Sequence, residues 1–121
     1  MEAAVKSHKR HVLSDQFLDL IAGRFKALSE SIRLKLILAL EDGELNVTDL
    51  VAATGMKQAN VSRHLQQLAR AGILSRRKAG AAAYYRIGDP AIFELCDHVC
   101  GSLKEQIKRD AEVSTLLSGL D

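Results

Sequence analysis

Apolar residues recur every three or four positions through the first half of the chain, which is the spacing of one face of an α-helix. One stripe, between residues 14 and 28, consists of Phe17, Leu20, Ile21, Phe25 and Leu28. Ser14 precedes this stripe, and a serine at that position caps a helix with its side-chain oxygen. Residues 32–40 are apolar on most sides, which predicts a second helix at the centre of the core. Two further helices are predicted over about residues 47–54 and 58–71, ended by Gly55 and Gly72.

The periodicity changes after Gly72. Residues 73–78 and 82–87 are expected to form two strands joined through residues 79–81. Pro90 then begins a last helix over about residues 90–112, because proline fits the first turn of a helix. The sequence therefore predicts a mainly helical α+β fold with four helices, a β-hairpin and a final helix. We expect a single domain over 14–121 and a flexible tail over 1–13.

Composition narrows the class of protein. A chain of 121 residues has the size of one domain, and 47% hydrophobic residues can fill its core. No apolar run approaches the ~18 residues that span a bilayer, and the N-terminus lacks the apolar segment of a secretory signal. We therefore expect a cytoplasmic protein with no membrane partner. The two cysteines, Cys96 and Cys100, are too close in sequence to form a disulfide framework.

Charge is concentrated in one part of the chain. Residues 56–87 contain seven basic residues and no acidic one, although the formal net charge of the whole chain is only +2. The basic residues are Lys57, Arg63, Arg70, Arg76, Arg77, Lys78 and Arg86. Lys and Arg side chains that neutralise phosphates release counterions, which supplies most of the sequence-independent affinity of nucleic-acid binders. The segment therefore favours a polyanionic partner over a merely solvated basic face.

Two of the predicted helices are joined by a short turn that contains Gly55, as in a helix-turn-helix. In that motif, side chains near the start of the second helix reach base edges in the major groove of DNA. The residues at those outward positions are Gln58, Asn60, Ser62 and Arg63. Amide side chains can pair with adenine, and a guanidinium can pair with guanine. The basic hairpin that follows is expected to act as a wing, with Arg76, Arg77 and Lys78 on phosphates or in a minor groove.

Four motifs in this arrangement resemble the ArsR/SmtB family of winged-helix repressors. They are the opening Leu28–Ile37, the recognition signature Gln58–Leu65, the helix exit Leu68–Ile73 and the wing end Tyr84–Arg86. The resemblance implies a winged helix-turn-helix homodimer whose first and last helices form the interface. It also implies that an inducer releases the dimer from a pseudo-palindromic operator in double-stranded DNA. We add Tyr85, at the wing end, and His64 to the predicted DNA-binding residues, and expect His64 at the surface within reach of a backbone phosphate.

The metal sites of the family are not repeated in this sequence. Members with a thiolate site in the DNA-reading module carry Cys-x-Cys near its first helix, where this chain has Asn46-Val47-Thr48. The positions of the zinc site on the last helix hold Asp89, Ala91, Ser102 and Glu105. Two imidazole ligands are therefore missing, and carboxylates alone make a poor zinc site. We expect neither of these metal sites.

Cys96 and Cys100 leave two interpretations open. Four residues apart on a helix, they share one face with Cβ atoms ~5–6 Å apart, which is too far for an unstrained disulfide. Two thiolates at this spacing can hold one thiophilic metal or metalloid, such as As(III), Cd(II) or Zn(II), or pair with thiols elsewhere in a dimer. Alternatively, both cysteines are small apolar residues packed beside Ile92, Val99 and Leu103 at the dimer interface.

The leading hypothesis is a sequence-specific DNA-binding transcriptional regulator, expected to be a repressor and not an enzyme. The alternative is a winged-helix interaction module, without an inducer site, whose basic face docks an acidic protein. Salt dependence of binding to defined and scrambled DNA separates these two hypotheses. A thiol enzyme that uses Cys96 and Cys100 is a third class, which the lack of a nearby general base or cleft signature disfavours.

Overall fold

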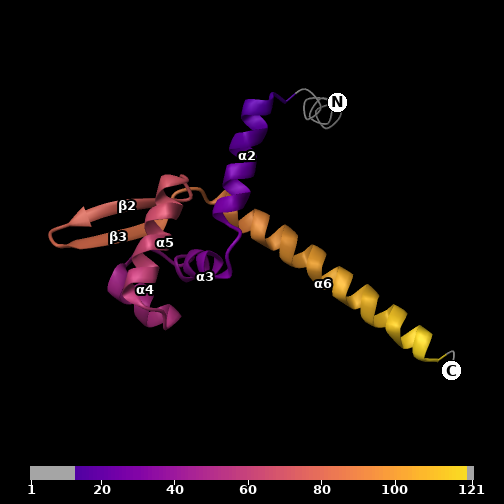
Figure 1. The fold of residues 1–121 in the computed structure, drawn as a ribbon. Coiled ribbons are helices and arrows are strands. Elements are labelled where there is room, and N and C mark those ends of the chain that lie inside the picture. The colour runs from indigo at the N-terminus through magenta and orange to yellow at the C-terminus, as the bar shows by residue number, and fades with distance from the viewer. Residues whose placement is uncertain (1–12, 120–121) are drawn as a thin grey trace. The chain divides into compact units, whose positions relative to one another are not determined.

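The computed structural model describes residues 13–119, so the predicted flexible tail lies almost entirely outside the described residues. The chain divides into two compact units, Met1–Gly88 and Asp89–Asp121. The prediction of one domain over 14–121 stays a prediction. The helices described in the first unit are α2 (Asp15–Ala27), α3 (Ser31–Ala39), α4 (Val47–Thr54) and α5 (Gln58–Arg70). Their bounds agree with the prediction to within about a residue at each end (Figure 1).

Two of these helices begin at side-chain caps that satisfy their first backbone N–H groups. The Oγ of Ser14 accepts a hydrogen bond from the N–H of Phe17 at 3.1 Å, as the sequence predicted. At α4, the Asn46 Oδ1 accepts from the N–H of Asp49 at 2.7 Å. The Asp49 carboxylate accepts in turn from the N–H of Asn46 at 3.4 Å, which completes a capping box. The start of α4 is therefore fixed by neighbouring residues.

A three-stranded antiparallel sheet completes the first unit, with β1 (Leu45–Asn46), β2 (Leu74–Ala79) and β3 (Ala82–Ile87) in the order β1-β3-β2. The hairpin was predicted, but β1 was not. β1 is two residues long and pairs with a distant part of the chain, so no local periodicity marks it. The hairpin turn is shorter than predicted, because Ala79 pairs with Ala82. Gly80 has a φ of 62°, and a glycine with positive φ at the first central position suits a tight type II′ turn.

Helices α3, α4 and α5 pack against one another around the core of this unit. Leu36 and Ile37 of α3 are 0% exposed, which confirms the central position predicted for that helix. Further residues with 0% exposure are Leu50, Val61, Leu65, Leu68 and Ile73. Because the buried residues of α5 recur at helical spacing, one side of this helix is anchored in the core and the other side faces solvent.

The second unit, in its described part, is the helix α6 (Ala91–Ser118). It begins after Pro90 as predicted, and the Asp89 carboxylate accepts a hydrogen bond from the N–H of Ala91 at 3.1 Å. It ends later than the predicted residue 112, because no glycine or proline follows Gly101 before Gly119. Its exposed large apolar residues are Val99, Leu103, Ile107, Val113, Leu116 and Leu117.

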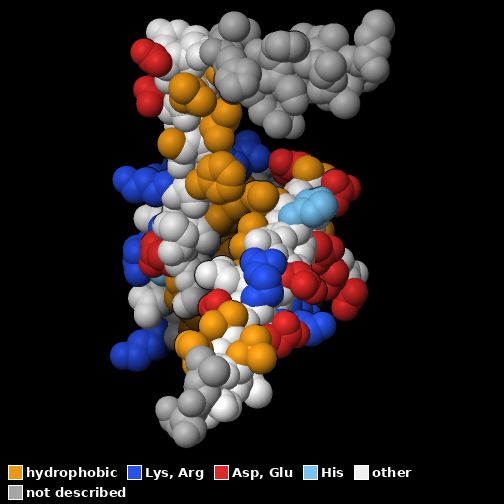
Figure 2. Space-filling view, turned by 90° about the vertical axis from the view of Figure 1, so that its right-hand side faces the viewer, with side chains coloured by type: hydrophobic (Ala, Val, Ile, Leu, Met, Phe, Trp, Pro, Cys, Tyr) orange, Lys and Arg blue, Asp and Glu red, His pale blue; other side chains and the backbone are white. Residues whose placement is uncertain are grey.

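Helix α2 also exposes apolar side chains. They are Phe17, Leu18, Leu20 and Phe25, with exposed fractions between 46% and 70%. Figure 2 shows hydrophobic side chains gathered along this helix. Contiguous apolar surfaces of this kind are typical of faces that another protein covers. Across residues 13–119, no helix combines the length and the apolar character that crossing a membrane requires.

Candidate nucleic-acid interface

Helices α4 and α5 form the predicted helix-turn-helix and pack against each other. The turn between them begins at Gly55, whose φ of 69° lies in the left-handed region that favours glycine. A Cβ atom at this position would meet no atom within 4 Å, so backbone conformation rather than crowding accounts for the glycine. The turn therefore sets the direction in which α5 leaves α4.

The first two turns of α5 carry the predicted base-reading side chains. Gln58, Asn60 and Arg63 are exposed, and Ser62 is partly exposed. At 100° per residue, Arg63 lies near the middle of the exposed side, opposite the buried residues of the same helix. The structure thus presents amide, hydroxyl and guanidinium groups at the start of a helix that the core holds in place.

The three predicted wing cations differ in their surroundings. Arg76 and Lys78 on β2 are exposed, as predicted. Arg77 instead donates hydrogen bonds from Nε and Nη2 to the two carboxylate oxygens of Glu44, at 3.1 Å and 2.7 Å. Its guanidinium also lies 4.8 Å from the centroid of the Tyr84 ring. The sequence therefore predicted the position of Arg77 in the wing but not its partner.

The ion pair stabilises the charged form of both side chains. The hydrogen bond from Arg77 lowers the pKa of Glu44, and the same bond raises the pKa of Arg77. Because the carboxylate stays ionised, it offsets one of the positive charges of the wing. Glu44 was not predictable from the sequence because it lies outside the basic segment 56–87 and immediately precedes β1, the strand that no local pattern marks.

Two predicted DNA-binding residues are buried. His64 is 2% exposed, so the expectation that it lies at the surface was wrong. Tyr85, which lies in the middle strand of the sheet opposite Leu45 of β1 and Arg76 of β2, is also 2% exposed. Neither side chain belongs to the exposed surface formed by the other predicted residues, and any contact of theirs with DNA stays a prediction.

Arg33, which the sequence did not mark as a site residue, is hydrogen-bonded to the buried His64. Arg33 of α3 donates from Nε to the Nδ1 of His64 at 3.1 Å. It also donates to the carbonyl of Ala27 and to the side chain of Gln67, and it pairs with Glu30. The signal in the sequence was an arginine in the largely apolar segment 32–40, where Lys35 is the other charged residue, within the motif Leu28–Ile37.

Both cysteines of α6 are free thiols. Cys96 is half-buried and Cys100 is exposed. Burial raises the pKa of the Cys96 thiol, with a further contribution from the charge of Asp97, so this thiol is held in its protonated form. In the described part of the chain, no group of three or more His, Cys, Asp or Glu side chains could hold a metal ion.

Comparisons with known proteins identify the family of this chain. A profile described as "Bacterial regulatory protein, arsR family" matches residues 30–76. The chain is 37% identical over 81 residues to the arsenic resistance transcriptional regulator ArsR1 of Pseudomonas putida, a match that covers 66% of this chain and 59% of that protein. It is 34% identical over 85 residues to the HTH-type transcriptional regulator NmtR of Mycobacterium tuberculosis, a match that covers 70% of this chain and 71% of that protein.

A solved structure agrees with these relatives. It is a homodimeric winged helix-turn-helix DNA-binding domain from Mycobacterium bovis, described as a possible ArsR-family transcriptional regulator. The two structures superpose with a TM-score of 0.69 and 32% sequence identity, over 81% of this chain and 94% of the other. The chain therefore belongs to the ArsR family of winged helix-turn-helix transcriptional regulators.

Proposed function

We propose that this protein is a homodimeric, cytoplasmic repressor in which α5 reads bases in the major groove and the hairpin of β2 and β3 contacts the DNA backbone. The observation that carries this proposal is the exposed polar start of α5, centred on Arg63, on a helix whose other side is fully buried. The exposed cations Arg76 and Lys78 follow on β2. The winged helix-turn-helix relatives support the same assignment.

The experiment that tests this function is selection of duplexes from a random-sequence pool by the wild-type protein. A two-fold dimer should enrich a pseudo-palindrome whose half-sites lie about one helical turn, ~34 Å, or a multiple of that, apart. If no sequence is enriched and scrambled DNA binds equally well, the basic face is better explained as a docking site for an acidic protein.

Base reading by Arg63 can be separated from its charge. Arg70 lies seven residues further along the same exposed side of α5, so Arg70→Ala removes the same charge away from the start of the helix. Arg63→Ala should cost roughly 1–3 kcal/mol of binding to the selected duplex and much less with scrambled DNA. Arg70→Ala should change the two affinities by similar factors. Equal weakening of both duplexes by Arg63→Ala would assign Arg63 to a phosphate contact.

For the inducer, we propose a thiophilic metal, metalloid or sulfur oxidant that acts at Cys96 and Cys100. The exposed thiol of Cys100, one helical turn from Cys96, supports this chemistry, as does the similarity to the arsenic resistance regulator of Pseudomonas. The protonated state of Cys96 supports the alternative, in which both residues only pack. Release of the selected duplex by As(III), Cd(II) or Zn(II) should be lost in the Cys96→Ser/Cys100→Ser variant. Identical release of both proteins would leave packing as the role of the cysteines.

A further inference from the structure

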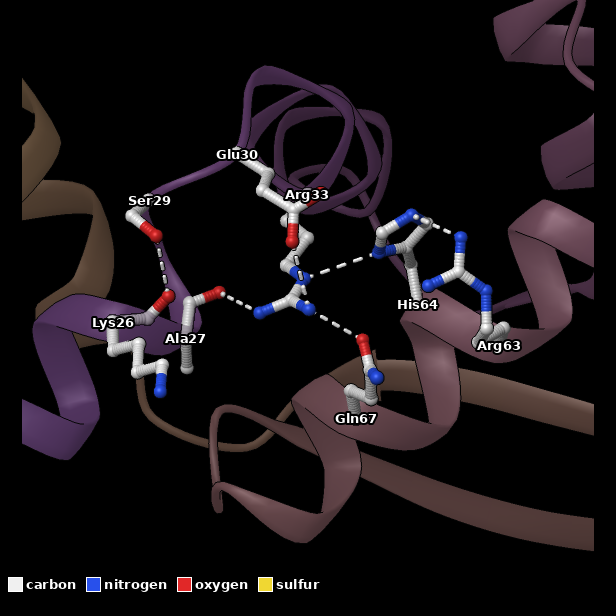
Figure 3. Close-up of polar contacts among 8 residues, drawn as sticks. All are labelled: Lys26, Ala27, Ser29, Glu30, Arg33, Arg63, His64 and Gln67. Atoms are coloured by element: carbon white, nitrogen blue, oxygen red, sulfur yellow. Dashed lines mark hydrogen bonds and ion pairs between the residues drawn. The ribbon is translucent and has the colours of Figure 1, made fainter.

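The guanidinium of Arg33 joins three helices at one point (Figure 3). From α3, it donates through Nη1 to the carbonyl oxygen of Ala27, the last residue of α2, at 3.1 Å. On α5 it donates through Nε to the Nδ1 of His64 at 3.1 Å and through Nη2 to the Oε1 of Gln67. Its own helix start supplies Glu30, whose carboxylate lies 3.0 Å from Nη2. With the side chain only 12% exposed, Arg33 is a largely buried polar link among helices that otherwise pack through apolar side chains.

The bond from Arg33 fixes which nitrogen of His64 carries hydrogen. A neutral imidazole has one donor and one acceptor nitrogen, and Nδ1 accepts from Arg33, so the hydrogen lies on Nε2. The Nη2 of Arg63 lies 3.4 Å from that Nε2. Two donors therefore face each other, and this contact does not tether Arg63. The guanidinium that we propose for base reading stays available to DNA.

Protonation of His64 would break this arrangement. An imidazolium carries hydrogen on both nitrogens, so Nδ1 could no longer accept from Arg33. The added charge would lie between the guanidinium groups of Arg33 and Arg63, with Glu30 as the carboxylate that faces it. Burial, together with the two arginines, accordingly lowers the pKa of His64, although Glu30 acts in the opposite direction.

The other elements packed on α5 contribute no compensating carboxylate to His64. The charged residue of α4 is Asp49, which is engaged in the capping box with Asn46. On β2, Arg77 is bound to Glu44, and the remaining charged residues, Arg76 and Lys78, are positive and exposed.

We infer that Arg33 and His64 are positioning residues for α5. The bond between them, which helps to hold α5 against α3, is made only while the imidazole is neutral, so binding to specific DNA weakens as pH falls. The inference rests on the proposed function of α5. The expected change of DNA affinity with pH is opposite to the usual one, because protonation of a histidine normally adds positive charge and strengthens binding to DNA. Loss of the Arg33 bond acts instead on the direction of α5, which alters base contacts more than phosphate contacts.

The decisive comparison uses His64→Asn. The Oδ1 of asparagine can occupy the position of Nδ1 and accept from Arg33, but asparagine does not titrate near neutral pH. His98→Asn, at an exposed position on α6, is the matched control. Dissociation constants for the duplex selected by the wild type, and for scrambled DNA, are measured between about pH 7.5 and pH 5.0 at constant ionic strength. Circular dichroism at each pH verifies that the helices are intact.

The wild type and His98→Asn should lose specific affinity relative to His64→Asn as pH falls from the ordinary histidine pKa of 6.5 towards the lowered pKa of folded His64. The loss should reach on the order of tenfold, which corresponds to about 1.4 kcal/mol of binding free energy. The change should be small for scrambled DNA. Parallel pH profiles of wild type and His64→Asn would overturn the inference.

Two further measurements test the bond between Arg33 and His64 independently of the pH comparison. Arg33→Lys keeps the positive charge but loses the planar guanidinium, whose several N–H groups bind several acceptors at once. It should therefore reduce the preference for the selected duplex at about pH 7.5 and weaken the dependence of DNA affinity on pH. Nitrogen NMR of the free protein should show His64 with hydrogen on Nε2, and a spectrum with hydrogen on Nδ1 would contradict the geometry. If the wild type binds no duplex at any pH, the proposed function fails, whereas the NMR result still decides the state of His64.

Discussion

The bidentate pair of Glu44 and Arg77 is the clearest case in which one side chain changes what another can do. The sequence predicts that Arg77, with Arg76 and Lys78, contacts the DNA backbone, and that role stays a prediction. In the structure both oxygens of Glu44 already accept hydrogen bonds from Arg77, in the geometry that a phosphate would offer. A phosphate would therefore have to displace the carboxylate.

Replacement of Glu44 by glutamine should strengthen binding to DNA of any sequence. The substitution removes the competing charge, so the plot of log K against log salt should become steeper by up to about one unit for one added phosphate contact. Glu41→Gln, an exposed change of the same charge in the segment before β1, is the control and should alter affinity less. If the two variants have equal slopes, Arg77 does not reach DNA.

Residue-scale electrostatics also predict a pH dependence of folding. The pKa of His64 is lowered in the folded chain, mainly by burial, so the unfolded chain binds more protons below the ordinary value of 6.5. The contribution of neutral His64 to stability is therefore complete above about pH 6.5 and is lost as pH falls towards the lower folded pKa. Urea midpoints at about pH 7.5 and pH 5.0 should fall further for wild type than for His64→Asn. A larger fall for the variant would contradict the direction of the pKa shift.

At the scale of elements, the helix-turn-helix depends on one left-handed residue. Gly55 has a φ of 69° and an open Cβ position, so Gly55→Ala should destabilise the fold by roughly 1–2 kcal/mol through backbone strain alone. Gly23, inside α2, also has an open Cβ position but ordinary helical geometry, so Gly23→Ala should stabilise by up to about 1 kcal/mol. Thermal or urea unfolding of both variants measures the two effects, and destabilisation by both would point to a contact at the added methyl group.

The apolar faces of α2 and α6 belong to the scale of the whole molecule. Each helix exposes several large apolar side chains, and we propose that a second copy of the chain covers both faces. Ile107, which is 66% exposed, should then tolerate Glu in a folded monomer but not in a dimer.

Ile107→Glu should shift the mass measured by sedimentation from dimer to monomer at a given concentration, with unchanged helical circular dichroism. Because the operator is proposed to have two half-sites, affinity for the selected duplex should fall much more than affinity for a single half-site. Gln106→Glu adds a charge at the adjacent exposed position and should leave the dimer intact. A dimeric Ile107→Glu protein would remove α6 from the interface.

Much of the fold followed from the sequence, because the relevant signals are local. The apolar spacing of α2 to α5, the cap at Ser14, the left-handed turn at Gly55 and the start of α6 after Pro90 each depend on neighbouring residues. The exposed residues Gln58, Asn60 and Arg63 were predictable for the same reason, since helical periodicity places them opposite the buried face.

Only the tertiary structure decided which polar groups meet across distant segments. β1 exists because Leu45 pairs with Tyr85, and the carboxylate of Glu44 reaches Arg77 from the residue just before that strand. His64 looked like a surface residue of a recognition signature, but packing of α3 against α5 buries it against Arg33. Hydrogen bonds between groups thirty or more residues apart leave no periodicity in the sequence, because closure of the intervening chain, not local conformation, brings them together.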